Sequence, residues 1–146
     1  MVRSISVLLF AFSIFSSWTV YCDAQINRSS MPQKDSKDLM INDILMLMLG
    51  EEIEKAVSDY YSPYLTQSPK VYPYQIKIVN VERVGEFRTF HFLITLETTP
   101  VVGPHISVGK DKLTFEIIPG RVRLKQLKHL ESHQLPLNWQ YIIKRK

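Results

Sequence analysis

Residues 75–96 contain two runs of strand-forming residues joined at Gly85-Glu86, a pattern that predicts a β-hairpin. In the second run every other residue is large and apolar, which predicts a strand with one apolar face: these residues are Phe90, Phe92, Ile94 and Leu96. The first run changes its apolar face near Val79, which predicts a β-bulge there. Because an apolar sheet face must be buried, another part of the chain has to cover it.

A helix predicted from residue 36 to Tyr61 can provide that cover. Asp35 or Ser36 has the short acceptor side chain of an N-cap, and Ser62-Pro63 stops the helix. Its apolar residues recur at intervals of three and four, as in an amphipathic helix: they are Ile41, Leu45, Met48, Leu49, Ile53, Ala56, Val57 and Tyr60.

Two features of this helix leave alternatives open. Gly50 marks either a kink or the end of a first helix. Met46 and Met48 are expected to fill gaps in the core, since methionine adapts to irregular spaces. The alternative is a second apolar face that touches a membrane or a partner chain.

The rest of the chain continues the sheet. Residues 112–118 alternate as a strand, Pro119-Gly120 signals a turn, and residues 121–130 form the next strand. Asn138 can cap a short helix that runs through Ile143. The order of elements predicts an α+β fold: one long N-terminal helix on an antiparallel sheet of about four strands, cystatin-like or NTF2-like, with a short C-terminal helix.

The first 24 residues have the pattern of a secretory signal peptide. A basic start is followed by an apolar run and by Cys22-Asp23-Ala24, with cleavage expected after Ala24. The alternatives are an uncleaved anchor, for which the run is short, and a lipid on Cys22, against which the bulky Tyr21 argues. The predicted organisation is signal peptide 1–24, flexible leader 25–35 and a single α+β domain 36–146. We therefore expect a secreted or cell-envelope protein.

Charge is unevenly distributed along the chain. Residues 25–69 carry four basic and seven acidic side chains, whereas residues 120–146 carry seven basic and one acidic. Arg121, Arg123 and Lys125 alternate along the last predicted strand. Outside a cell such a basic face would meet teichoic acids, anionic lipid or released nucleic acid. The alternative is an ordinary solvated strand face.

The loop at residues 102–111 is the most promising place for a site, because loops on rigid scaffolds often carry binding residues. Its two glycines and a proline fix an unusual backbone path, and His105, Ser107, Lys110 and Asp111 supply polar side chains. A structural turn in which His105 and Asp111 form local hydrogen bonds explains the same residues.

No serine-hydrolase elbow, phosphate-binding glycine loop or Cys-x-x-Cys pair occurs in the sequence. His129 and His133 would share one face of a helix and could hold a metal. We expect strand there instead, with the two residues about 13 Å apart and exposed to solvent. No metal site and no cofactor is predicted.

Several short motifs resemble one family. They are Val102-Gly103-Pro104-His105, Val108-Gly109-Lys110-Asp111 with Thr114-Phe115, Val57-Ser58-Asp59-Tyr60-Tyr61 and Leu135-Pro136. Over about residues 38–143 the chain resembles a family of small exported proteins of Gram-positive spore-forming bacteria, a domain of unknown function (family 3888). The resemblance implies an exported protein with one α+β domain, and it implies no activity, ligand or catalytic residue.

Three functions are consistent with these observations. The leading hypothesis is a non-enzymatic domain that binds a partner or an anionic wall polymer through His105, Lys110, Asp111, Arg121, Arg123 and Lys125. An alternative is a small hydrolase or metal-dependent enzyme that uses His105 and Asp111. A third is an inhibitor or chaperone of another exported protein, with the sheet edge or the methionine-rich helix as its contact surface. Specific nucleic-acid binding is not expected, and membrane contact is expected only if the signal segment is retained.

Overall fold

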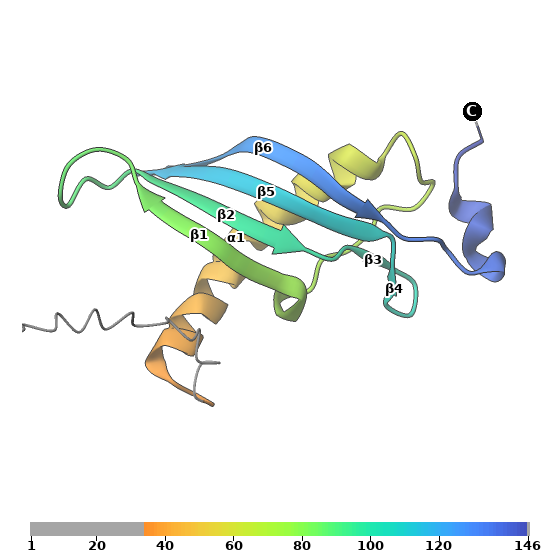
Figure 1. Cartoon of the computed structure of the whole chain (residues 1–146), viewed down its shortest axis with the longest axis horizontal. Helices are drawn as coiled ribbons and strands as arrows, with labels where there is room; N and C mark the ends of the chain where they lie inside the picture. The colour runs from red at the N-terminus through yellow and green to blue at the C-terminus, as the bar shows by residue number, and fades with distance from the viewer. Residues whose placement is uncertain (1–33, 146) are drawn as a thin grey trace, which may run out of the picture. The chain divides into compact units, whose positions relative to one another are not determined.

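The computed structural model describes residues 34–145, which form one long helix and a four-stranded antiparallel sheet (Figure 1). The elements in chain order are α1 (Lys37–Tyr61), η1 (Pro73–Gln75), β1 (Ile76–Arg83), β2 (Phe92–Thr98), β3 (Val101–Val102), β4 (Ile106–Ser107), β5 (Gly109–Ile118), β6 (Arg121–Ser132) and η2 (Leu137–Ile142). This confirms the predicted α+β class. The expected signal peptide and residues 25–33 of the expected leader lie outside the described residues. No helix within residues 34–145 is both long enough and apolar enough to cross a membrane.

Helix α1 begins and ends where the sequence predicts. The Ser36 side chain accepts a hydrogen bond from the Leu39 N–H at 3.2 Å, which caps the first turn. The helix ends at Tyr61, next to Ser62-Pro63. The helix passes through Gly50 without a break, so Gly50 does not end a first helix.

The buried face of α1 differs in part from the predicted stripe. Its buried residues are Met46, Leu49, Ile53, Ala56, Val57 and Tyr61. Ile41 and Met48 were expected in the core, yet they are 51% and 76% exposed. The reason is the side of the helix on which they lie. Met46 and Leu49 flank Met48 and are buried, whereas at 3.6 residues per turn Ile41 and Met48 point away from the sheet.

The sheet has the strand order β1-β2-β5-β6, and every neighbouring pair is antiparallel. The predicted hairpin is β1 and β2, and its register shifts between Ile78 and Asn80, which confirms the bulge near Val79. Its connection is longer than expected. Phe90 was predicted in the strand, but it lies in the loop before Phe92 and is 64% exposed.

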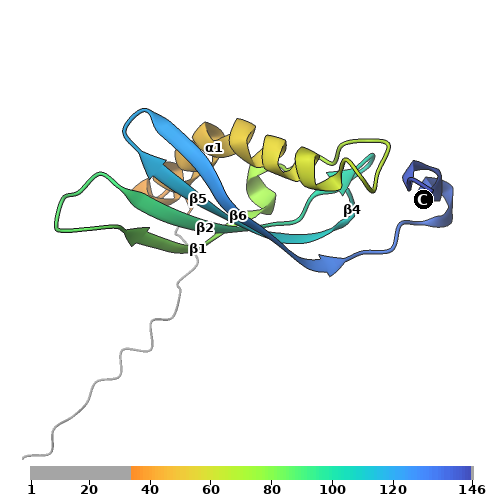
Figure 2. The ribbon, with the colours of Figure 1, turned by 90° about the horizontal axis from the view of Figure 1, so that it is seen from above.

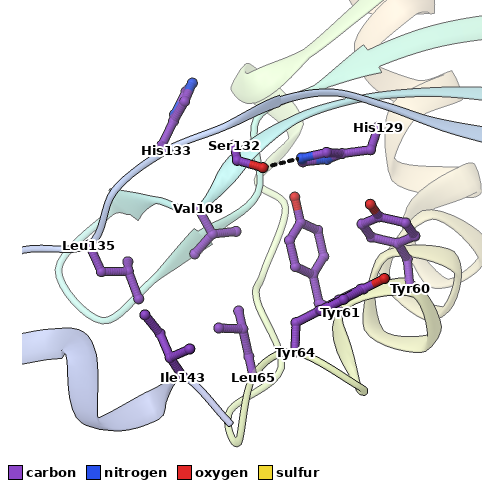
Figure 3. A pocket seen from close by; sticks show the side chains of 10 residues that line it. All are labelled: Tyr60, Tyr61, Tyr64, Leu65, Val108, His129, Ser132, His133, Leu135 and Ile143. Carbon is purple, nitrogen blue, oxygen red and sulfur yellow. Dashed lines mark hydrogen bonds between the residues drawn. The ribbon is translucent and has the colours of Figure 1, made fainter. Parts of the chain in front are cut away.

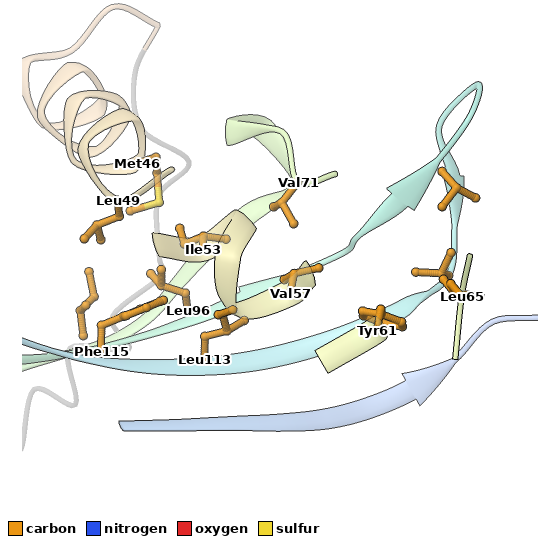
Figure 4. Close-up of a cluster of buried hydrophobic side chains, with 14 of the residues drawn as sticks. Met46, Leu49, Ile53, Val57, Tyr61, Leu65, Val71, Leu96, Leu113 and Phe115 are labelled. Carbon is orange, nitrogen blue, oxygen red and sulfur yellow. The ribbon is translucent and has the colours of Figure 1, made fainter. Parts of the chain in front are cut away.

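The core lies between α1 and one face of the sheet (Figures 2 and 4). Ile94 and Leu96 of β2 pair with Phe115 and Leu113 of β5, and all four are almost completely buried. The period of two in β2 and β5 places these residues on the side that faces Ile53 of α1. The other side of the sheet, called the open face below, carries polar and charged residues.

The C-terminal segment ends as a 3-10 helix rather than an Asn138-capped helix. The N-cap position of η2 is Pro136, and no side chain caps it. The backbone of Ile143 bridges to Leu65, just after α1. Trp139 packs so closely on Gly103 that a Cβ atom there would lie 2.0 Å from its ring, and Gly103 also has a positive φ of 50°.

Candidate functional site

A cavity of about 320 Å³ lies where the C-terminal turn of α1 meets the end of β6 (Figure 3). Its lining is aromatic and apolar with a few polar groups: Tyr60, Tyr61, Tyr64, Leu65, Val108, His129, Ser132, His133, Leu135 and Ile143. Among the described residues, no Asp, Glu, Lys or Arg side chain lines this cavity. Such an apolar cavity with a few convergent polar groups is typical of small-molecule sites.

A chain of hydrogen bonds runs from the interior to the wall of this cavity. The Asp111 side chain is completely buried, and its Oδ2 accepts a bond from the Tyr61 hydroxyl at 3.0 Å. Its Oδ1 lies 2.7 Å from Nδ1 of His129, and Nε2 of His129 lies 2.7 Å from Oγ of Ser132. We call these four residues the polar relay.

Strand register explains why Asp111 is buried. It lies two residues before Leu113 and four before Phe115, so it faces α1 like them. Its partner across the sheet is His129, which lies two residues after Leu127. A buried carboxylate requires hydrogen-bond partners, and here Tyr61 and His129 provide them.

A β-bulge brings His129 and Ser132 together. Lys110 pairs with Glu131, but Asp111 pairs with His129, so Leu130 is an extra residue in β6. Residues three apart on a regular strand face opposite sides, and one inserted residue places them on the same side. The bulge therefore aims the Ser132 hydroxyl at the imidazole.

Gly109 leaves the space that the polar relay occupies. A Cβ atom at this position would lie 2.5 Å from the Glu131 carbonyl oxygen, 2.7 Å from the Tyr61 hydroxyl and 2.9 Å from Cε1 of His129. Any larger residue would displace the strand or the two rings. The glycine is required here by close approach.

Aromatic rings hold the imidazole in place. The ring of Tyr60 stacks on His129 with centroids 5.4 Å apart, and Tyr61 meets it edge-on at 6.1 Å. Burial, followed by the charge and hydrogen bond of Asp111, raises the pKa of Tyr61 well above its usual value. Burial, followed by Tyr64 and Asp111, also raises the pKa of Tyr60. Both hydroxyls therefore stay protonated at neutral pH.

The relay fixes the roles of the two imidazole nitrogens. A carboxylate only accepts hydrogen bonds, so Nδ1 of a neutral His129 must carry the proton and Nε2 is left as an acceptor. An acceptor nitrogen next to a serine hydroxyl is the geometry of a general base. Within residues 34–145, no group of three or more His, Cys, Asp or Glu side chains could hold a metal ion.

The structure separates the two residues that the sequence suggested as an enzymatic pair. His105 has a positive φ of 61°, and its Nδ1 lies 2.9 Å from the Tyr74 hydroxyl. Its ring lies 4.8 Å from that of Tyr72. No hydrogen bond or ion pair joins His105 to Asp111, whose partners are Tyr61 and His129.

The expectation that His129 and His133 are both exposed is wrong for His129, because its side chain is 24% exposed and bonded to Asp111. His133 instead lies with its Nδ1 2.7 Å from Oγ of Ser107. The sequence contained a sign of the polar relay, since Asp111 and His129 continue the alternation of apolar residues in their strands. No feature of the sequence predicted the bulge at Leu130.

The remaining predicted residues lie on the open face. Lys110 forms an ion pair with Glu97 at 3.4 Å, and Lys125 forms one with Glu116 at 3.7 Å. The register places Arg123 opposite Glu116, and Arg121 opposite Ile118, on the same side. These four residues therefore share a surface, whereas Asp111 faces the core and His105 lies on the β3–β4 turn.

The family comparison agrees with the resemblance in the sequence. The family described as "Protein of unknown function (DUF3888)" matches residues 41–131, which include Tyr60, Tyr61, Asp111 and His129. No curated protein and no solved structure matches the chain. Because the match covers more than half of the chain, the protein belongs to the DUF3888 family.

Proposed function

We propose that this chain is an exported domain, secreted or held in the cell envelope, that binds an anionic wall polymer through the open face of its sheet. The proposal rests on one observation: the strand register places many basic side chains on this face of the sheet. The basic residues there are Lys77, Lys110, Lys112, Arg121, Arg123, Lys125 and Lys128. The acidic residues there are Glu82, Glu97, Glu116 and Glu131.

The cations fall into two groups. Lys110 and Lys112 both pair with Glu97, and hydrogen bonds from them, that of Lys112 first, lower the pKa of this carboxyl. A hydrogen bond with His91 and the charge of Lys125 likewise lower the pKa of Glu116. No salt bridge within residues 34–145 engages Arg121, Arg123 or Lys128, and these side chains are exposed.

Three of the free cations lie along β6, which is an edge strand, and Lys77 of β1 is a fourth. At a rise of about 3.3 Å per residue, Arg121 and Arg123 are roughly 7 Å apart and the row to Lys128 is roughly 20 Å long. Spaced charges of this kind match a polymer that carries an anion on each repeat. The attraction is long-range and decreases with salt, because the screening length falls to about 3 Å at 1 M.

A charge-matched pair of variants tests the proposal. Arg121, Arg123 and Lys125 are replaced by glutamine in one variant, and Lys37, Lys55 and Lys70 in the control. A cation near an anionic surface contributes about 1 kcal/mol, so the first variant should lose on the order of a hundredfold in affinity. Binding is measured on wall preparations with and without their teichoic acid, at 0.05 to 1 M salt.

The proposal requires that wild-type protein and the control variant bind the polymer-containing wall and elute with salt. Equal binding of both variants, or retention that salt does not reduce, would contradict it. The mature N-terminus of the protein from the producing cells tests export separately. A chain that starts at Gln25 agrees with the proposal, and a chain that retains residues 1–24 would place it at a membrane.

A second candidate function rests on α1. Apolar side chains in its N-terminal half are exposed within one arc of about 120° on the helical wheel: they are Met40, Ile41, Ile44, Leu47 and Met48. This stripe favours contact with another exported protein, as an inhibitor or chaperone would make. Suppression of the aggregation of reduced lysozyme, abolished by Met48→Glu, would support this function. Equal suppression by wild-type protein and this variant would show that the stripe is not the contact surface.

A further inference from the structure

We propose that Ser132 is a nucleophile, with His129 as its general base, in a site that transfers the acyl group of a small uncharged ester. This activity goes beyond polymer binding and does not depend on it, because the polar relay faces α1 and not the open face. The proposal rests on three observations: the order of atoms in the relay, the burial of its carboxylate and the cavity at its end.

The order of atoms matches the requirement for an activated serine. Oγ of Ser132 lies 2.7 Å from Nε2 of His129, so the imidazole can take the hydroxyl proton. Nδ1 on the other side lies 2.7 Å from Asp111, which orients the ring and stabilises the imidazolium that forms. The Tyr61 hydroxyl bonds the second oxygen of this carboxylate and holds it in place.

Ser107 and His133 form a second serine–histidine pair, and the comparison shows which feature distinguishes Ser132 and His129. Oγ of Ser107 lies 2.7 Å from Nδ1 of His133, a contact just as short. The other nitrogen of His133 lies 3.5 Å from Glu131, whose side chain is 58% exposed, whereas Asp111 is completely buried. Of these two serines, Ser132 alone is joined through its histidine to a buried carboxylate, and Ser107 serves as an internal control.

The reaction can be written with the groups present. Oγ of Ser132 attacks the carbonyl carbon of the ester while its proton passes to Nε2 of His129. The tetrahedral intermediate collapses, and the alcohol leaves with that proton. Water, deprotonated by His129, then attacks the acyl-serine and releases the carboxylic acid and the free serine. The step needs no oxidant and no metal.

The developing oxyanion needs a hydrogen-bond donor. Tyr60 lines the cavity and stacks on His129, and its raised pKa keeps its hydroxyl protonated. We assign it this role, so Tyr60→Phe should lower kcat with little change in KM. A variant that changes KM alone would show that Tyr60 only binds substrate.

The cavity limits the class of substrate. Its walls beyond Ser132 are mostly apolar, formed by Tyr64, Leu65, Val108, Leu135 and Ile143, with His133 as the polar exception. Among residues 34–145 no Asp, Glu, Lys or Arg side chain lines it. At about 320 Å³ it lies at the small end of ligand sites. These features fit a short apolar acyl or alkoxy group and disfavour a charged one.

The experiment uses the mature chain and a fluorophosphonate ester, which modifies activated serines. Peptide mass spectrometry measures the adduct on Ser132 and on Ser107 in the same sample. Ser132 should react at least tenfold faster, and His129→Gln should slow it by about a hundredfold or more. Hydrolysis of p-nitrophenyl butyrate should be lost in Ser132→Ala and retained in Ser107→Ala.

Equal labelling of the two serines in the wild-type protein would overturn the proposal, and this comparison needs no variant to fold. Butyrate hydrolysis that survives Ser132→Ala would also overturn it. For the positioning residue, Asp111→Asn should shift the pH profile of Ser132 labelling, whereas a purely structural role would leave the profile in place. Thermal unfolding of each variant verifies that it is folded.

Discussion

Replacement of Gly109 by alanine should destabilise the domain through contact alone. The φ angle of Gly109 is not positive, so alanine fits the backbone. Its Cβ, however, would lie 2.5 Å from the carbonyl oxygen of Glu131, where no rotamer change can relieve the contact. It would also lie 2.7 Å from the Tyr61 hydroxyl.

The expected magnitude follows from these two contacts. Overpacking in a close-packed region costs about 1–3 kcal/mol. Displacement of the Tyr61 hydroxyl would remove a hydrogen bond to a charged group, which contributes about 1.5–3 kcal/mol. The two costs are not additive, because movement of the Tyr61 hydroxyl away from the new Cβ also relieves part of the overpacking. We therefore expect a total loss of stability of about 2–4 kcal/mol. For a domain of this size that lowers Tm by roughly 8–16 °C.

Urea unfolding monitored by Trp139 fluorescence, together with calorimetry, measures this loss. Gly50→Ala is the matched control, because nothing lies within 4 Å of its added Cβ and the position is inside α1. That variant should gain about 0.5–1 kcal/mol. A Gly109→Ala protein as stable as wild type would refute the view that the glycine makes room for the polar relay.

Three further changes test the core, the relay and the open face. Thr98→Val should stabilise the fold by about 1 kcal/mol in urea unfolding, because no partner within residues 34–145 bonds its buried hydroxyl; a loss of stability would contradict this. Above pH 10 the unfolded chain loses the Tyr61 proton while the folded chain keeps it, so wild-type stability should fall by up to about 1.4 kcal/mol per pH unit more steeply than that of Tyr61→Phe. If the stabilities of the wild-type protein and Tyr61→Phe fell in parallel above pH 10, the raised pKa of Tyr61 would be contradicted. The lowered pKa values of Glu97 and Glu116 stabilise the fold above their usual pKa, and this contribution should be lost as pH falls through the lowered values. A Glu97→Gln variant with an unchanged acid-unfolding profile would contradict that assignment.

The sequence predicted the elements well because each depends on local pattern. The N-cap at Ser36, the bulge near Val79 and the turn at Pro119-Gly120 all follow from nearby residues, and the structure contains all three. The buried face of α1 was predicted less accurately. Apolar residues lie on both sides of the N-terminal half of this helix, and spacing alone does not reveal which side faces the sheet, so Met48 was placed in the core although it is exposed.

The candidate site was predicted only in part. Asp111 was named as a candidate binding residue, and the enzymatic alternative joined it to His105, which is close in sequence. Its actual partner, His129, is 18 residues away and reaches it through strand pairing. The extra residue in β6, Leu130, then places Ser132 on the same side of the strand as His129. Such a relation depends on the pairing of two strands and on a bulge between them, which residues close in sequence do not reveal.

The tautomer of His129 tests the polar relay most directly. A long-range ¹H–¹⁵N spectrum of the protein, recorded at a pH where this imidazole is neutral, distinguishes the two nitrogens. We expect the proton on Nδ1, donated to Asp111, and an unprotonated Nε2 that accepts from Ser132. A proton on Nε2, or the tautomer mixture of a free imidazole, would contradict the relay and the chemistry assigned to it.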